Sequence, residues 1–176
     1  MKCLLSFLLA VCLLSGLAQS LHCPTRPDIN VTCDKSGTQK YTLIGNKYYF
    51  ASESKVNWIE AVHTCRRYGG DLATIENAAE MHAISTYLIG QHYDANHWLW
   101  ISGNDLVTVR NFSSIATGMP LTYFNWSAGQ PDYPNLEHCI HLWLKGAEFK
   151  MNNWQCNEKA YYLCERQNDA RCWDGF

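Results

Sequence analysis

The spacing of apolar residues predicts two amphipathic helices in the first half of the chain. The first covers about residues 55–68, starts after Ser54 as its N-cap and stops at Gly69-Gly70, since glycine favours helix ends. Its apolar stripe consists of Trp58, Ala61, Val62 and Cys65. This spacing puts Cys65 on the buried face of the helix.

The second helix covers about residues 77–89. Asn77 and Glu80 have the spacing of a capping box, and Gly90 marks the end of the helix. Its apolar stripe consists of Met81, Ile84 and Leu88. Residues 71–75, which join the two helices, are expected to form a short buried segment.

The strands are predicted to be short. Residues 41–50 hold two β-favouring runs around Gly45-Asn46, which predicts a strand–turn–strand unit. Residues 98–101 (Trp-Leu-Trp-Ile) predict a central strand, and residues 140–144 and 160–164 are expected to complete the sheet. Two helices followed by short strands and long loops predict an α+β fold, and the length suits one domain.

The first twenty residues have the pattern of a secretory signal. Lys2 supplies a positive charge, residues 3–14 are apolar, and a small-residue cleavage site ends at Ser20, with Ala18 as the alternative position. The apolar run is shorter than the roughly 20 residues that span a bilayer, and no later segment is long and apolar enough. We therefore expect a secreted, extracellular product with no membrane partner.

Composition restricts the partners and the redox state of the exported chain. The formal net charge is −2, and loss of Lys2 with the signal makes it −3. Phosphate binding needs clustered Lys and Arg, which argues against a nucleic-acid partner. Removal of the signal also takes Cys3 and Cys12 and leaves seven of the nine cysteines. In an exported chain these cysteines indicate disulfides.

Residues 21–40 are polar and are predicted to form an extended N-terminal arm. Asn30 begins a glycosylation sequon, which fits an exposed position there. Asn111 and Asn125 begin two further sequons. Trp126, inside the last sequon, is expected to pack, which disfavours glycosylation of Asn125.

The stretch from Phe124 to Cys164 carries the most informative polar residues. Five oxygen-bearing side chains are expected in two short polar loops: Gln130, Asp132, Glu137, Asn152 and Asn153. Calcium takes about six to eight oxygen ligands from carboxylates, amides and carbonyls, so this set of donors suits calcium. A cis bond between Gln130 and Pro131 would let the two side chains that flank the proline point to one side.

The ordered motifs of this stretch resemble a C-type lectin domain of the short secreted insect type. The motifs are Gln130-Pro131-Asp132, Glu137-His138-Cys139, Asn152-Asn153 and Tyr161-Tyr162-Leu163-Cys164-Glu165. The resemblance covers residues 41–166 and leaves residues 167–176 as a C-terminal tail. It implies two helices packed on small antiparallel sheets, with long calcium-binding loops stapled by disulfides.

By this resemblance, the five oxygen-bearing side chains hold one calcium ion, and Asn153 adds its backbone carbonyl. In such lectins, sugar hydroxyls complete the calcium shell and exchange hydrogen bonds with the same side chains. Members with Gln-Pro-Asp bind galactose-type sugars, so galactose or N-acetylgalactosamine is the expected ligand. Tyr133 is the candidate for packing on the sugar, against the alternative of a loop tyrosine with no ligand contact.

Two positions depart from the family pattern. The family has Trp-Asn-Asp where this chain has Met151-Asn152-Asn153, and the loss of one negative charge implies a weaker calcium site. Ser114 stands where the family carries an aromatic residue, which implies a less packed loop before the site. A second calcium site would need more acids near Asp105 and directly after Asp132, so one calcium is expected.

The resemblance also implies two disulfides, Cys65–Cys164 and Cys139–Cys156, of which the second ties the two calcium-bearing loops together. Cys23, Cys33 and Cys172 remain, an odd number. Their positions favour a Cys33–Cys172 bridge that leaves Cys23 for a partner chain. The alternative is a Cys23–Cys33 loop with Cys172 intermolecular. Either arrangement implies a disulfide-linked homodimer.

The expected function is that of a secreted, calcium-dependent galactose-binding lectin in innate immune recognition or agglutination. The alternative is a calcium-independent C-type-lectin-like domain that binds a protein or another non-sugar ligand. An enzyme is disfavoured, since no G-x-S-x-G or H-E-x-x-H motif occurs and Asp132 and Glu137 are assigned to metal. A zinc site is disfavoured because the histidines are scattered.

Overall fold

The computed structural model describes residues 41–167 of the chain. The signal, the N-terminal arm with Asn30, the C-terminal tail from residue 168 and the pairing of Cys23, Cys33 and Cys172 lie outside the described residues and stay predictions. Within residues 41–167, none of the helices has the length and apolar character needed to cross a membrane.

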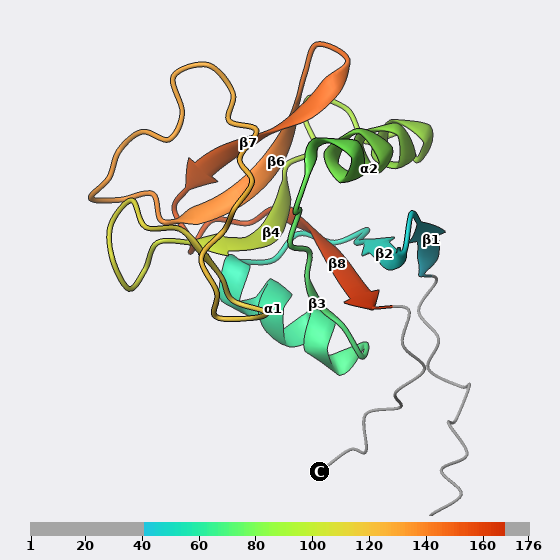
Figure 1. Cartoon of the computed structure of the whole chain (residues 1–176), viewed down its shortest axis with the longest axis horizontal. Helices are drawn as coiled ribbons and strands as arrows, with labels where there is room; N and C mark the ends of the chain where they lie inside the picture. Colours follow the sequence, from blue (N-terminus) through green and yellow to red (C-terminus); the bar gives the residue numbers. More distant parts are fainter. Residues whose placement is uncertain (1–40, 168–176) are drawn as a thin grey trace, which may run out of the picture. The chain divides into compact units, whose positions relative to one another are not determined.

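Between residues 41 and 167 the chain forms two helices and eight strands (Figure 1). The helices are α1, Trp58–Arg67, and α2, Ala78–Gly90. The strands are β1, Thr42–Ile44; β2, Lys47–Ala51; β3, Asp71–Leu72; β4, Leu99–Asn104; β5, Ser113–Ser114; β6, Cys139–Lys145; β7, Glu148–Trp154; and β8, Tyr161–Gln167. The α+β prediction is confirmed, as is the turn at Gly45-Asn46 between β1 and β2.

The strands lie in the order β1-β2-β8-β4-β6-β7, with β3 paired to β8 and β5 paired to β4. All pairings are antiparallel except β4 with β8, so the sheet is mixed and not purely antiparallel as expected. A parallel pair needs a long connection. Here the connection consists of the long loop between β4 and β6 (residues 105–138, which include β5) and the β6–β7 hairpin. The last strand therefore lies in the middle of the sheet.

Both helices form where the apolar pattern predicts them, but α1 starts later. Its N-cap is Asn57, whose side-chain oxygen accepts a hydrogen bond from the Glu60 N–H at 2.8 Å, and not Ser54. The reason is tertiary, because Val56 is engaged in a β-bridge with Ala160 and is not helical. For α2 the predicted cap is confirmed, since the Asn77 side chain accepts from Glu80 N–H at 2.9 Å.

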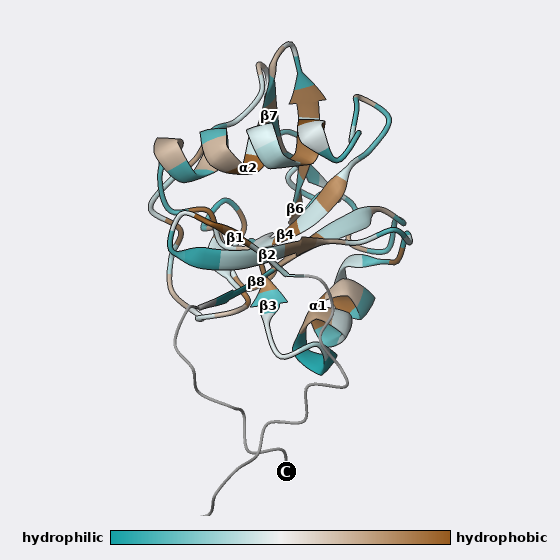
Figure 2. Ribbon diagram, turned by 90° about the vertical axis from the view of Figure 1, so that its right-hand side faces the viewer, coloured by the Kyte–Doolittle hydropathy of each residue, from teal (hydrophilic) through white to brown (hydrophobic). Residues whose placement is uncertain are grey.

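The core has two parts, one under each helix. The predicted stripe of α2 packs with apolar residues of β4, β6 and β7, among them Leu142 and Phe149. The stripe of α1 packs with Trp100 and both disulfides. Trp58 is fully buried, and its indole N–H donates to the Ile101 carbonyl at 2.8 Å. Figure 2 shows hydrophobic segments of β6 and β7 beside α2.

Two disulfides fix the ends of the polar stretch, and both match the expected pairs. Cys65 of α1 is bonded to Cys164 of β8, with Cα atoms 5.4 Å apart. Cys139, at the start of β6, is bonded to Cys156, just after β7, with Cα atoms 5.2 Å apart. The second bridge holds the end of the long loop beside the end of β7.

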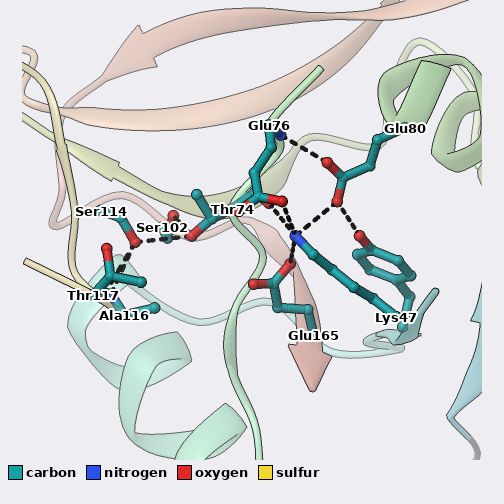
Figure 3. Close-up of polar contacts among 10 residues, drawn as sticks. Lys47, Thr74, Glu76, Glu80, Ser102, Ser114, Ala116, Thr117 and Glu165 are labelled. Carbon is teal, nitrogen blue, oxygen red and sulfur yellow. Dashed lines mark hydrogen bonds and ion pairs between the residues drawn. The ribbon is translucent and has the colours of Figure 1, made fainter. Parts of the chain in front are cut away.

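Ser114 is buried, contrary to the expected loose packing at this position. It lies in β5, and its hydroxyl is hydrogen-bonded to the Thr74 hydroxyl at 2.8 Å (Figure 3). Thr74 is bonded in the same way to Ser102 of β4 at 2.8 Å. A chain of three hydroxyl groups thus anchors the start of the long loop where the family carries an aromatic residue.

Lys47 is a buried cation, only 3% exposed, that joins β2, β8 and the start of α2 (Figure 3). Its Nζ contacts Glu80 at 3.0 Å, Glu76 at 3.1 Å, Glu165 at 3.3 Å and the Thr74 carbonyl at 3.1 Å. Burial raises the pKa of Glu165 to about 7, and the nearby Lys47 charge opposes that rise. Lys47 is therefore the counter-charge that offsets the free-energy cost of burying the Glu80 and Glu165 carboxylates.

Replacement of Lys47 by methionine is expected to lower the free energy of unfolding by about 3–5 kcal/mol, because Glu80 and Glu165 lose their cation. Urea unfolding at pH 7, followed by tryptophan fluorescence, measures this loss. Lys145→Met, at an exposed lysine without an ion pair in residues 41–167, serves as the control. A Lys47→Met protein as stable as that control would contradict this role of Lys47.

Candidate functional site

The predicted site residues come from two elements, the loop before β6 and the strand β7. The bond between Gln130 and Pro131 is cis, and the loop turns back on itself where the Glu137 N–H donates to the Tyr133 carbonyl at 3.0 Å. Asn152 and Asn153 were expected in a loop, but both lie inside β7. They are buried there because β7 pairs along its whole length with β6.

Asn153 ties the loop to the sheet. Its side-chain nitrogen donates to the carbonyls of Asp132, at 2.5 Å, and Glu137, at 2.9 Å. Its side-chain oxygen accepts from the Asp132 N–H at 2.9 Å. An aspartate could not donate these two bonds, so the asparagine that departs from the family pattern has a positive role in holding the loop.

Two of the predicted side chains present buried oxygen atoms that have no hydrogen-bond partner. They are Gln130 Oε1 and Asn152 Oδ1, and the Tyr41 hydroxyl is the third such atom within residues 41–167. A buried polar atom without a partner costs about 1–3 kcal/mol and calls for an explanation. A cation that accepts both oxygens as ligands would satisfy them, so these residues fit a calcium ion.

The orientation of Asn152 depends on His141, its partner across the β6–β7 pair. Burial lowers the pKa of His141 to about 4, so the imidazole is neutral. Its Nδ1 is 3.3 Å from the Leu142 carbonyl and its Nε2 is 2.9 Å from the Asn152 side-chain nitrogen. Nδ1 therefore donates to the carbonyl, Nε2 accepts from the amide, and the Asn152 oxygen points away from the imidazole.

Asp132 and Glu137 are the two carboxylates of the site. Burial is the main cause that raises the pKa of Glu137 to about 7, and a hydrogen bond and repulsion from Asp132 add to it, while the Arg110 charge opposes it. In the metal-free protein the two carboxyl groups are thus held close enough to compete for a proton. A divalent cation between them would remove this repulsion.

Tyr133 is 64% exposed, with a positive φ of 41°. Its ring lies at the surface next to Asp132, where it is free to contact a ligand. The structure does not give it a packing role in the loop, so its proposed sugar contact stays a prediction.

Asp105 and His138 form a link at the base of the loop that sequence reasoning missed. Asp105 is buried and accepts from His138 Nδ1, at 2.9 Å, and from the Arg110 N–H, at 2.7 Å. Both of its oxygens are therefore engaged within the protein. The partners of His138 and His141 depend on tertiary contacts, including the β6–β7 register, and so could not be foreseen from the sequence.

The two sequons within the described residues differ in their surroundings. Asn111 is exposed. The Asn125 side chain is half-buried, with its nitrogen 3.3 Å from Glu148 and its oxygen 3.0 Å from Lys150 Nζ. Asn111 is thus the more accessible of the two, and glycosylation at both stays a prediction.

None of the predicted site residues lines the cavity of about 350 Å³ near the end of α2, whose walls include Tyr87, Tyr93 and Tyr161. The residues described by the structure also contain no group of three or more His, Cys, Asp or Glu side chains placed to hold a metal. The predicted set differs from such a group, since only two of its members are carboxylates and three are amides. It is a set of amide and carboxylate oxygens, which are the hard donors that calcium prefers.

Comparisons with known proteins agree with this geometry. The family model described as "Lectin C-type domain" matches residues 54–166. C-type lectin 37Db of Drosophila melanogaster is 38% identical over 128 residues, which are 72% of this chain and 82% of that protein. The galactose-specific lectin nattectin of Thalassophryne nattereri is 33% identical over 149 residues, 83% of this chain and 91% of that protein.

A solved structure gives the same result for the fold. The carbohydrate-recognition domain of the mouse scavenger receptor C-type lectin superposes with a TM-score of 0.64 and 25% sequence identity, over 75% of this chain and 97% of that chain. With a family match over more than half of the chain, these likenesses show a non-enzymatic binding domain. The chain belongs to the C-type lectin domain family.

Proposed function

We propose that the protein is a secreted lectin that binds galactose or N-acetylgalactosamine through one calcium ion. The observation that carries this proposal is the pair of buried, unpartnered oxygens on Gln130 and Asn152, because Asn153, the next residue after Asn152, is hydrogen-bonded to the loop that carries Asp132 and Glu137. Two amide and two carboxylate groups are the donor chemistry that calcium prefers. Asn153 is retained in the ligand set for its backbone carbonyl.

The mechanism assigns a task to each kind of side chain. Calcium, when bound, offers open coordination positions to two neighbouring sugar hydroxyls. The carboxylates of Asp132 and Glu137 can only accept hydrogen bonds from those hydroxyls, whereas the amides of Gln130 and Asn152 can donate as well. The placement of acid and amide around the loop therefore selects the hydroxyl geometry, and Tyr133 supplies a ring for the apolar face of the sugar.

Two facts support galactose over mannose. The loop reads Gln130-Pro131-Asp132, the order that the family resemblance links to galactose-type sugars. A relative that is 33% identical is described as galactose-specific. Secretion, innate recognition and agglutination belong to the same proposal, and the odd cysteine count supports a disulfide-linked dimer that would raise weak single-site affinity.

A second candidate is a calcium-independent domain of the same fold that binds a protein or another non-sugar ligand. The observation that favours it is Asn153, which replaces a negative ligand and whose side-chain oxygen already accepts from the Asp132 N–H. The loop is thus held by internal bonds that need no metal. The lectin proposal requires that the two remaining carboxylates supply enough negative charge for calcium.

Passage of the protein over galactose–agarose in millimolar calcium decides between the two candidates. Retention on galactose–agarose, its absence on mannose–agarose and release by EDTA are expected. Asn152→Ala is expected to abolish retention because it removes one of the proposed calcium ligands. Retention that survives EDTA, or no retention on any sugar resin, would favour the calcium-independent candidate.

The calcium affinity is expected to fall as the pH is lowered, because calcium needs the Glu137 carboxylate and its pKa is raised to about 7. Below that pKa a proton competes for the carboxylate, and the affinity should drop roughly tenfold per pH unit. Calorimetric titration with calcium at pH 8, 7 and 6 measures this. The Glu137→Gln protein should bind weakly with little pH dependence, and an equal affinity at pH 8 and 6 in the wild type would refute the assignment.

Asn153→Asp is expected to lower the free energy of unfolding by about 1–3 kcal/mol in EDTA, since the Asp132 and Glu137 carbonyls lose their donor. Thermal or urea unfolding of the metal-free proteins provides the measurement. Asn135→Asp makes the same chemical change at an exposed loop position and is the matched control. If both variants are as stable as the wild type, Asn153 does not hold the loop.

A further inference from the structure

A second recess lies between the segments around Lys55, Trp98 and Trp154, separate from the proposed calcium site. Its volume is about 160 Å³, and it is lined by Lys55, Asn96, Trp98, Trp154, Lys159 and Ala160. Since liquid water occupies about 30 Å³ per molecule, the recess has room for one sugar ring or part of one. None of the proposed calcium ligands is among its walls.

Two indole rings form rigid walls of this recess. Trp98 and Trp154 meet edge to face, with ring centroids 4.7 Å apart and an interplanar angle of 81°. Trp98 is also stacked on His141, with centroids 5.3 Å apart. Because His141 contacts the Asn152 amide, and because Trp154 lies two residues after Asn152 on the same face of β7, the recess adjoins the proposed sugar site.

The charge of the recess is positive although the chain as a whole is acidic. Lys55 and Lys159 are exposed, and neither forms an ion pair with a carboxylate in residues 41–167. Lys55 Nζ lies 5.0 Å from the ring centroid of Tyr161, which holds the ammonium group beside the recess. No carboxylate lines the recess. By contrast, Lys47, which is buried, and Lys150, which is half-buried, are both paired with glutamate.

Indole faces and unpaired ammonium groups together suit a ligand with an apolar ring face and a negative charge. We propose that this recess binds an anionic saccharide, one that carries a sulfate or a carboxylate group, and that it does so without calcium. The sugar ring packs on Trp98 and Trp154, the Lys55 and Lys159 ammonium groups bind the anion, and the Asn96 amide is available to a hydroxyl. The lectin would thus have two adjacent subsites of different chemistry.

Surface-immobilised galactose 6-sulfate and galactose, each displayed on the same polymer, provide the test in a biosensor experiment. In calcium, the full chain is expected to bind the sulfated surface more tightly than the plain one. In EDTA, binding to plain galactose is expected to vanish while weaker binding to the sulfated surface persists. Lys55→Gln and Lys159→Gln should each weaken binding to the sulfated surface about two- to five-fold and leave plain galactose binding unchanged.

Lys145→Gln is the matched control, since Lys145 is also exposed, has no ion pair within residues 41–167 and lies over an indole ring, that of Trp143, but does not line the recess. The proposal is overturned if the protein binds the sulfated surface no more tightly than the plain one, or if Lys145→Gln lowers binding to the sulfated surface as much as the other two variants. It is also overturned if sodium sulfate or AMP, at matched ionic strength, competes for the sulfated surface as well as free galactose 6-sulfate does. Loss of plain galactose binding alone would refute the calcium-dependent proposal and leave this one standing.

Discussion

The side-chain amide of Asn153 is the contact on which the candidate site depends. It lies in β7, fully buried, and forms three hydrogen bonds to the backbone of the loop that carries Asp132 and Glu137. The Cys139–Cys156 bridge fixes the same two chain segments covalently, one step further from the ligands. Because β7 fixes the position of Asn153, these hydrogen bonds also fix the backbone of the loop at Asp132 and Glu137, although the loop has no regular secondary structure.

Two clusters of buried polar groups differ in whether their atoms have hydrogen-bond or ion-pair partners. Around Lys47, three glutamates and a backbone carbonyl surround one ammonium group, and nearly every atom has a partner. At the proposed calcium site, by contrast, the oxygens of Gln130 and Asn152 have no partner, and burial raises the pKa of Glu137 to about 7. The first arrangement stabilises the fold, whereas each unpartnered oxygen of the second costs free energy.

Sequence patterns predicted the framework better than the site. The apolar stripes of both helices, the central strand at Trp100 and the buried segment around Leu72 depend on burial, which repeats with the period of each element. The start of α1 was misjudged because Val56 pairs with Ala160, a contact 104 residues away in sequence. The site residues came from a motif resemblance, but their placement in β7 and the role of His141 follow from strand register, which local sequence does not reveal.

The central position of β8 constrains how the chain can be made. This last strand lies between β2 and β4, and its Cys164 is the partner of a cysteine 99 residues earlier. The β1–β2 hairpin and the β4-β6-β7 strands can each pair without β8, but β2 and β4 cannot be joined into one sheet until β8 has been synthesised. Cys65 therefore lacks its native disulfide partner for 99 further residues of synthesis, and the bridge between α1 and β8 is among the last long-range contacts that the domain can form.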